Sequence, residues 1–106
     1  MGLDITISRA KPVYCPHCGE LITYKSVEDA DSNGRVWYEF LESIGYYNSD
    51  DSDMYGQDMV LDDEKLNKLI GFVNRCLKDG YKFYHIKYLI EEARIDGDKI
   101  VINADW

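Results

Sequence analysis

Two cysteines separated by two residues are the part of this sequence that most directly suggests chemistry. Cys15 and Cys18 belong to the run Cys-Pro-His-Cys-Gly. At this spacing two thiolates can face one metal ion, and a glycine directly after them can adopt the positive φ that turns backbone amides toward the sulfurs. The flanking residues 12–14 and 21–24 are mostly apolar or β-branched, which predicts that the motif is the tip of a β-hairpin.

This segment resembles the knuckle of a zinc ribbon over about ten residues, 13–22, although the usual second Cys pair is absent. A closed structural zinc site needs four ligands. The sequence predicts Zn²⁺ held by Cys15, Cys18, Cys76 and His85, provided that the helical half of the chain folds back over the hairpin. Two alternatives stay open. Two chains can share one ion through two knuckles, or the knuckle keeps its turn and binds nothing.

The same motif allows a redox interpretation. Thioredoxin-like oxidoreductases also use a Cys-Pro-His-Cys sequence, in which the first thiolate is stabilised at a helix N-terminus. Here the motif is followed by Gly19, Ile22 and Thr23, which begin a helix poorly. A thiol redox protein acting through Cys15 and Cys18 therefore ranks below zinc binding as an alternative.

The charges of the 106-residue chain are distributed unevenly around a net charge of −8. The window from Glu28 to Glu64 holds twelve acids and a single base, Arg35, so it carries −11 while the rest carries +3. Such asymmetry argues against direct contact with nucleic acid and favours a basic partner or a metal ion. A solvated surface that keeps the protein soluble is the alternative.

Alternating apolar and polar residues predict a strand over residues 3–8, and residues 99–103 read as another strand. Residues 9–11 are expected to link the first strand to the hairpin, and no element is assigned to the polar, acidic residues 26–33. We expect one α+β domain spanning residues 1–106. Its small antiparallel sheet contains the N-terminal strand, the knuckle hairpin and the C-terminal strand, packed against about three helices.

Helical spacing of apolar residues predicts the three helices. The first covers residues 37–44 and ends at Gly45. The second begins after Asp62, a good N-cap, and carries Cys76 on its apolar stripe, where a buried thiol is the expected outcome. The third is expected within residues 81–94.

An acidic, tyrosine-rich loop over residues 46–58 is long for an inert connection. The chain has nine tyrosines and two tryptophans, more than a small core can hide, and tyrosine is enriched at protein interfaces. We therefore expect a protein-binding surface on this loop. Its predicted residues are Tyr46, Tyr47, Asp50, Asp51, Asp53, Tyr55 and Asp58.

The opening Met-Gly-Leu-Asp-Ile, together with the knuckle, looks like small proteins of phages and prophages. This resemblance implies an accessory protein. Joined to the acidic composition, it leads to the hypothesis of an inhibitor that occupies a basic nucleic-acid-binding surface on a host defence enzyme, as DNA-mimic anti-restriction and anti-CRISPR proteins do. The expected partner is thus a protein and not nucleic acid or a membrane, and the expected state is monomer or homodimer. The alternative is a zinc-stabilised structural or regulatory module without such a partner.

Motifs of several enzyme classes are missing from the sequence. It contains no Gly-rich phosphate loop, nucleophile elbow or His-Glu-x-x-His motif, so we do not expect an enzyme. No apolar run approaches the roughly 20 residues that span a bilayer. Asp4 and Arg9 interrupt any signal-peptide pattern, and three cysteines do not make a disulfide framework, so a cytoplasmic location is expected.

Overall fold

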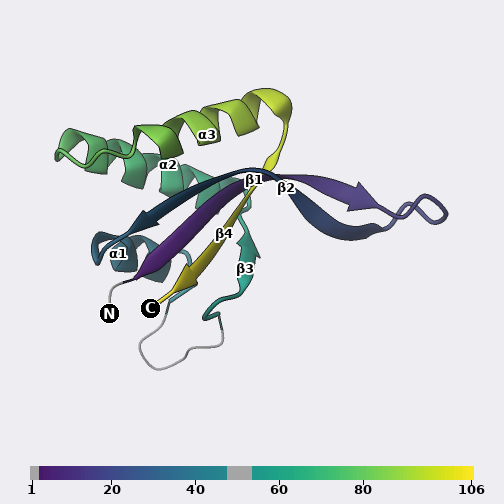
Figure 1. Ribbon diagram of the computed structural model, residues 1–106, viewed down its shortest axis with the longest axis horizontal. Helices are drawn as coiled ribbons and strands as arrows, with labels where there is room; N and C mark the ends of the chain where they lie inside the picture. The colour runs from purple at the N-terminus through teal and green to yellow at the C-terminus, as the bar shows by residue number, and fades with distance from the viewer. Residues whose placement is uncertain (1–2, 48–53) are drawn as a thin grey trace.

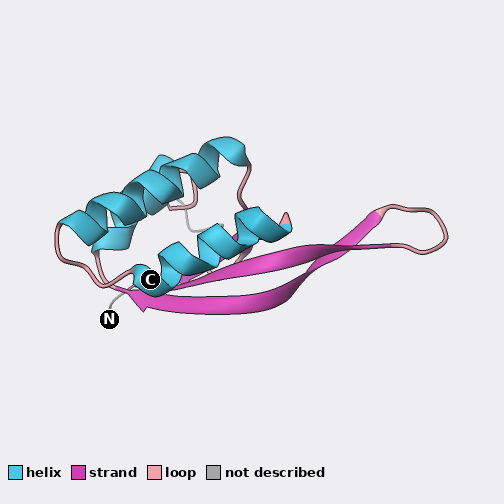
Figure 2. Cartoon of the chain, turned by 90° about the horizontal axis from the view of Figure 1, so that it is seen from above, coloured by secondary structure: helices cyan, strands magenta, loops and turns pink. Residues whose placement is uncertain are grey.

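A four-stranded antiparallel sheet carries three helices on one of its faces in the computed structural model, which describes residues 3–47 and 54–106 (Figures 1 and 2). The predicted α+β class is confirmed. In chain order the elements are β1 (Asp4–Tyr14), β2 (Leu21–Asn33), α1 (Val36–Ser43), β3 (Asp58–Val60), α2 (Asp63–Lys78), α3 (Tyr84–Asp96) and β4 (Lys99–Asp105).

The strand order is β2-β1-β4-β3, so the first and last strands are neighbours at the centre. Side chains alternate between the two faces of a strand. Ile5 and Ile7 of β1 are buried against the helices, whereas Thr6 and Ser8 point to the other face. We call this second face, which none of the three helices in the described residues covers, the open face.

The hairpin is longer than the sequence predicts. The expected strand at 3–8, the expected link at 9–11 and the first side of the knuckle hairpin form one continuous strand, β1. Residues 26–33 belong to β2, where only Ala30 is buried. Because β2 is an edge strand with little burial, its sequence lacks the apolar alternation that marks a strand. Both expectations are therefore corrected.

Beyond Ala10, β1 no longer pairs with β4 and pairs only with β2. A register shift falls at this point, where Val27 has no partner across the hairpin. Such a bulge bends the strands and increases their twist. We call residues 11–25 the hairpin arm, and Figure 1 shows it projecting well beyond the helices.

An aromatic cluster lies at the centre of the core between the sheet and the helices. Trp37 of α1 is fully buried, and its ring lies 4.9 Å from that of Phe72 and 5.2 Å from that of Phe83, centroid to centroid. Its indole N–H donates to the hydroxyl of Ser32 on β2 at 2.9 Å, so the buried polar atom has a partner.

The helix ends follow their sequence signals. Asp62 caps α2 by accepting a hydrogen bond from the backbone N–H of Lys65 at 2.8 Å, as predicted. Gly45 lies just past α1 with φ 76°, a left-handed conformation that costs glycine little, which confirms its expected role. None of the helices in the described part of the chain is both long and apolar enough to cross a bilayer.

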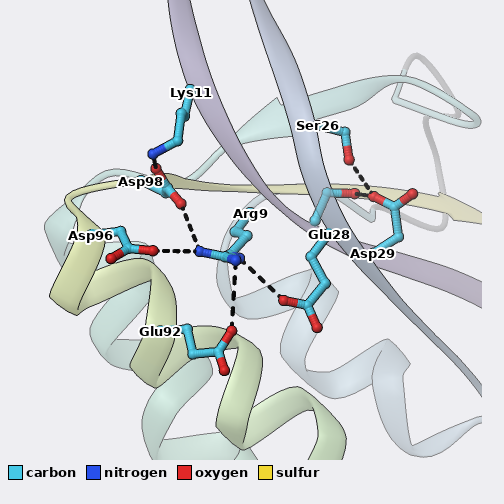
Figure 3. A network of polar contacts seen from close by, with 9 residues as sticks. Arg9, Lys11, Ser26, Glu28, Asp29, Glu92, Asp96 and Asp98 are labelled. Atoms are coloured by element: carbon cyan, nitrogen blue, oxygen red, sulfur yellow. Dashed lines mark hydrogen bonds and ion pairs between the residues drawn. The ribbon is translucent and has the colours of Figure 1, made fainter.

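Arg9 ties the sheet to the end of α3 (Figure 3). Its guanidinium contacts four carboxylates, which belong to Asp96 (2.8 Å), Asp98 (3.1 Å), Glu28 (3.2 Å) and Glu92 (3.6 Å). The Asp98 side chain is only 1% exposed and also accepts from Lys11 Nζ at 2.6 Å. The hydrogen bond from Arg9 to Asp96 is the largest of the contributions that raise the pKa of Arg9.

Arg9→Met is expected to lower the Tm by several degrees. Methionine keeps the apolar stem but leaves four converging carboxylates without their shared cation, one of them buried. Arg94→Met, at an exposed position on α3, is the matched control and should change the Tm little. Thermal unfolding followed by circular dichroism measures both, and equal shifts for the two variants would contradict the structural role of Arg9.

Candidate functional site

The Cys-Pro-His-Cys-Gly motif forms the tip of the hairpin arm, as the sequence predicts. The N–H of Cys15 donates to the carbonyl of Glu20 at 2.7 Å, and the N–H of Gly19 donates to the carbonyl of Cys15 at 2.9 Å. Gly19 has φ 74°, which other residues adopt only with strain. These bonds close a tight turn that brings both cysteines to the end of the arm.

The turn aims backbone dipoles at one sulfur. The backbone N–H groups of Cys18 and His17, together with the Cys18 thiol, hold the pKa of Cys15 below its usual value. The motif does not begin a helix, so the helix-terminal stabilisation used by thioredoxin-like proteins is absent here. Cys15 is half-buried and Cys18 is exposed. Chemically, the tip presents two sulfurs, and backbone amides favour the anionic form of the one that belongs to Cys15.

The structure does not bring the four predicted zinc ligands together. Cys76 is 1% exposed in the helical core, where burial raises the pKa of its thiol, so the expectation of a buried core thiol is confirmed. The ring of His85 on α3 lies 3.1 Å from the backbone oxygen of Asp31. Over residues 3–47 and 54–106, no group of three or more His, Cys, Asp or Glu side chains is placed to hold a metal. The helices cover the body of the sheet and do not fold back over the arm (Figure 2).

The residues predicted to bind a partner have different surroundings. Tyr46 is 2% exposed and hydrogen-bonded to the end of β4, so its expected role as an exposed anchor is corrected to a core role. Tyr47 is half-buried and Tyr55 is 47% exposed, and each ring lies 5.0 Å from that of Trp106. Asp58 is exposed on the open face. Three predicted positions lie outside the described residues, namely Asp50, Asp51 and Asp53.

No protein-family model, curated protein or solved structure matches this chain. The candidate site therefore follows from the chemistry of the molecule's own surface.

Carboxylates gather on the open face of the sheet. They come from all four strands and belong to Asp4, Asp29, Asp31, Asp58 and Asp105. Hydrogen bonds orient three of them, because Thr6 donates to Asp31 at 2.9 Å, Ser8 donates to Asp29 at 2.6 Å and the Asn103 amide donates to Asp58 at 2.9 Å. Lys99 lies on the same side of β4, at the end nearer the arm.

The charges on this face lie close together. Neighbouring strands lie about 4.8 Å apart, and alternate residues of one strand lie about 6.6 Å apart. Asp4 is paired directly with Asp105 across β1 and β4. Hydrogen bonds from Ser26 and then Ser8 hold the pKa of Asp29 below its usual value, so this carboxylate stays charged. The open face thus presents an array of negative charge that hydrogen bonds hold in part.

A groove of about 330 Å³ lies where the open face meets the hairpin arm. Its lining is largely apolar and includes Ala10, Leu21, Ile22, Tyr24, Val60 and Val101. Ile22 is 63% exposed and Leu21 is 46% exposed, so both apolar side chains remain partly open to solvent. Asp58 and Ser26 contribute polar groups to the same groove.

The acidic window of the sequence only partly predicts this array. Asp29, Asp31 and Asp58 lie inside the window, but Asp4 and Asp105 lie at the two ends of the chain. The feature of the sequence that could have identified these two residues is the alternation of polar and buried residues, as in Asp4-Ile-Thr-Ile. This alternation places the acidic side chain on the face of the strand away from the core. Which strands become neighbours cannot be read from that alternation.

The third helix, α3, buries one side and exposes the other. Tyr81, Tyr84 and Tyr88 are exposed, while Ile86 and Ile90 are buried against the sheet side of α3. These tyrosines lie on the helical layer and not on the open face.

Proposed function

We propose that this protein is an acidic protein-binding module whose open face occupies a basic, nucleic-acid-binding surface of a partner protein. The observation that carries the proposal is the array of five carboxylates on an uncovered sheet face. Like charges placed directly opposite each other destabilise a sheet. The pairing of Asp4 with Asp105 therefore does not serve folding, and an interaction with a cationic surface gives it a role.

The groove supports a partner rich in lysine and arginine. These side chains combine an aliphatic stem with a charged head, and the stem prefers apolar surface. An apolar groove bordered by Asp58 offers contacts to both parts. Arginine and lysine are the residues with which nucleic-acid-binding proteins contact phosphates, so a carboxylate array competes for the same side chains. An inhibitor of a host defence enzyme, of the kind that phages encode, would act in this way.

The immobilised full-length chain is expected to capture a nucleic-acid-binding protein from a bacterial lysate. Release by a salt gradient is expected, because exposed charge pairs are screened over about 8–10 Å at physiological ionic strength. Double-stranded DNA added as competitor should also release the partner, since both ligands would use the same basic surface. A captured protein that DNA does not displace would contradict the proposal.

A matched pair of variants then assigns the binding to the open face. Asp4→Asn, Asp31→Asn and Asp58→Asn together should weaken binding about tenfold, since each exposed charge pair contributes up to ~1 kcal/mol. The control removes three charges from the helical layer, through Glu42→Gln, Glu64→Gln and Glu91→Gln. Equal loss of affinity in both triple variants, measured at low salt, would show that only net charge matters.

A further inference from the structure

The knuckle at the tip of the hairpin arm provides half of a closed zinc site. A structural zinc ion takes four ligands. Cys15 and Cys18 are both accessible at the tip, whereas Cys76 is packed in the core. In the described part of the chain no third His, Cys, Asp or Glu joins the pair. In the described residues the tip therefore provides two of the four ligands, and the other two positions of the zinc coordination shell, which we call the open half-shell, have no ligand from the same chain.

We propose that two copies of this protein bind one Zn²⁺ between their hairpin tips, each copy contributing the sulfurs of Cys15 and Cys18. Four thiolates complete a tetrahedral shell that neither copy supplies alone. As the ion binds, each of the four thiols releases its proton to solvent and its sulfur donates an electron pair to the metal. No residue is oxidised or reduced. This assembly is separate from the proposed role of the open face.

The shape of the molecule allows two tips to meet. The arm extends past the last pair between β1 and β4, which joins Ala10 to Lys99. Figures 1 and 2 show that the helices and the other two strands lie behind it, along the 47 Å long axis of the molecule. Two copies meeting end to end therefore bring their cysteines together without contact between their helical layers.

The arm carries little of the molecule's negative charge. The chain as a whole carries −8, but the arm contains two bases, Lys11 and Lys25, and one acid, Glu20, which gives +1. The two lysines lie opposite each other at the base of the arm, where Lys11 is paired with Asp98, and the acid Glu20 lies close to the tip. Contact between two tips therefore keeps the more acidic bodies of the two copies apart.

The sides of the arm carry apolar surface that a second arm would cover. Tyr14 is 57% exposed and Val13 is 37% exposed, and the two lie on opposite sides of the arm directly before Cys15. A second copy joined through the zinc ion would cover part of both side chains, because they directly precede Cys15 in the arm.

The test measures metal content and molecular mass on the same sample. Full-length protein purified with zinc under reducing conditions is expected to hold one zinc per two chains and to elute as a dimer in size-exclusion chromatography with light scattering. A chelator should convert it to monomers, and Co²⁺ in place of zinc should give the absorption spectrum of a tetrathiolate site. Cys18→Ser should be monomeric and lose zinc, while Cys76→Ala should keep both zinc and the dimer.

Three results would overturn the shared site. They are one zinc on each monomeric chain, protein without bound zinc at any added concentration, and a dimer that survives chelation under reducing conditions. Because Cys18 is exposed, Cys18→Ser is expected to keep the native far-ultraviolet circular dichroism spectrum. Chelation of the wild-type protein tests the assembly independently of any variant.

Discussion

Trp37→Ala is expected to lower the free energy of unfolding by about 3–5 kcal/mol, the usual cost of removing a large buried aromatic side chain. Trp37 is fully buried, and it contacts rings from α2 and from the residue preceding α3. Its loss leaves a cavity that Phe40, Phe72 and Phe83 cannot all close, and it leaves the Ser32 hydroxyl without its donor. Small domains have only about 5–15 kcal/mol in total, so this single change removes a large share.

Urea unfolding of wild type and variant measures this effect. The accompanying fall in Tm should exceed about 10 °C, because 1 kcal/mol corresponds to about 4–8 °C in a domain near this size. Tyr88→Ala is the matched control, since Tyr88 is an aromatic residue that is 61% exposed on α3. Its effect should stay within about 0.5 kcal/mol. Comparable losses in the two variants would mean that the aromatic cluster is not the centre of the core.

Tyr46→Phe should cost about 1–3 kcal/mol, the range found when buried hydrogen-bonding groups lose their partner. The Tyr46 hydroxyl accepts from the backbone N–H of Ala104 at 2.9 Å and donates to the carbonyl of Gln57. The Tyr46 hydroxyl lies at the end of β4, next to Ala104, where β3 no longer pairs with β4. Phenylalanine fills the same volume but leaves both backbone groups unsatisfied. Tyr88→Phe, at an exposed position, should leave the stability unchanged.

The Tyr46 hydroxyl is also expected to make the stability of the protein depend on pH in the alkaline range. Burial, more than any other cause, raises the pKa of Tyr46 above its usual value, and the nearby charges of Asp105 and Asp58 add to the increase. The stabilising contribution is therefore fully present below pH about 10, the unfolded pKa of tyrosine, and is lost as the pH rises through the folded pKa. Tyr46→Phe should show a shallower loss of stability above pH 10 than wild type. If the free energy of unfolding fell equally with pH above pH 10 in the wild type and in Tyr46→Phe, Tyr46 would be excluded as the titrating group.

Local signals predicted the parts of the fold that local interactions determine. Asp62 caps α2 through a bond to a residue three positions on, and Gly45 ends α1 through its own φ. Both effects act within one helical turn, so the sequence contains them. β3 has only three residues, too few to show any period, and it is held by its partner β4. The residues of β4 that determine the position of β3 lie more than forty positions further along the chain.

The candidate site was harder to predict for a related reason. The turn at Cys15 and Cys18 is local, and the structure forms it as expected. The predicted ligands Cys76 and His85 depended on where the helices pack, which spacing does not determine. Similarly, the loop prediction grouped Tyr46 with surface residues because its neighbours are polar, although its ring fills the edge of the core.

β1 pairs with both β2 and β4 in its first part and with β2 alone in its last part, so substitutions in the two parts have different consequences. Its first seven residues are held between two neighbours, and a substitution there alters the whole sheet. The remaining four are supported only by β2, outside the core. A substitution at Val13 or Tyr14 changes what the molecule can touch while leaving its folding energy nearly intact. The arm can therefore be redesigned to recognise other surfaces, with the body serving as an unchanged scaffold.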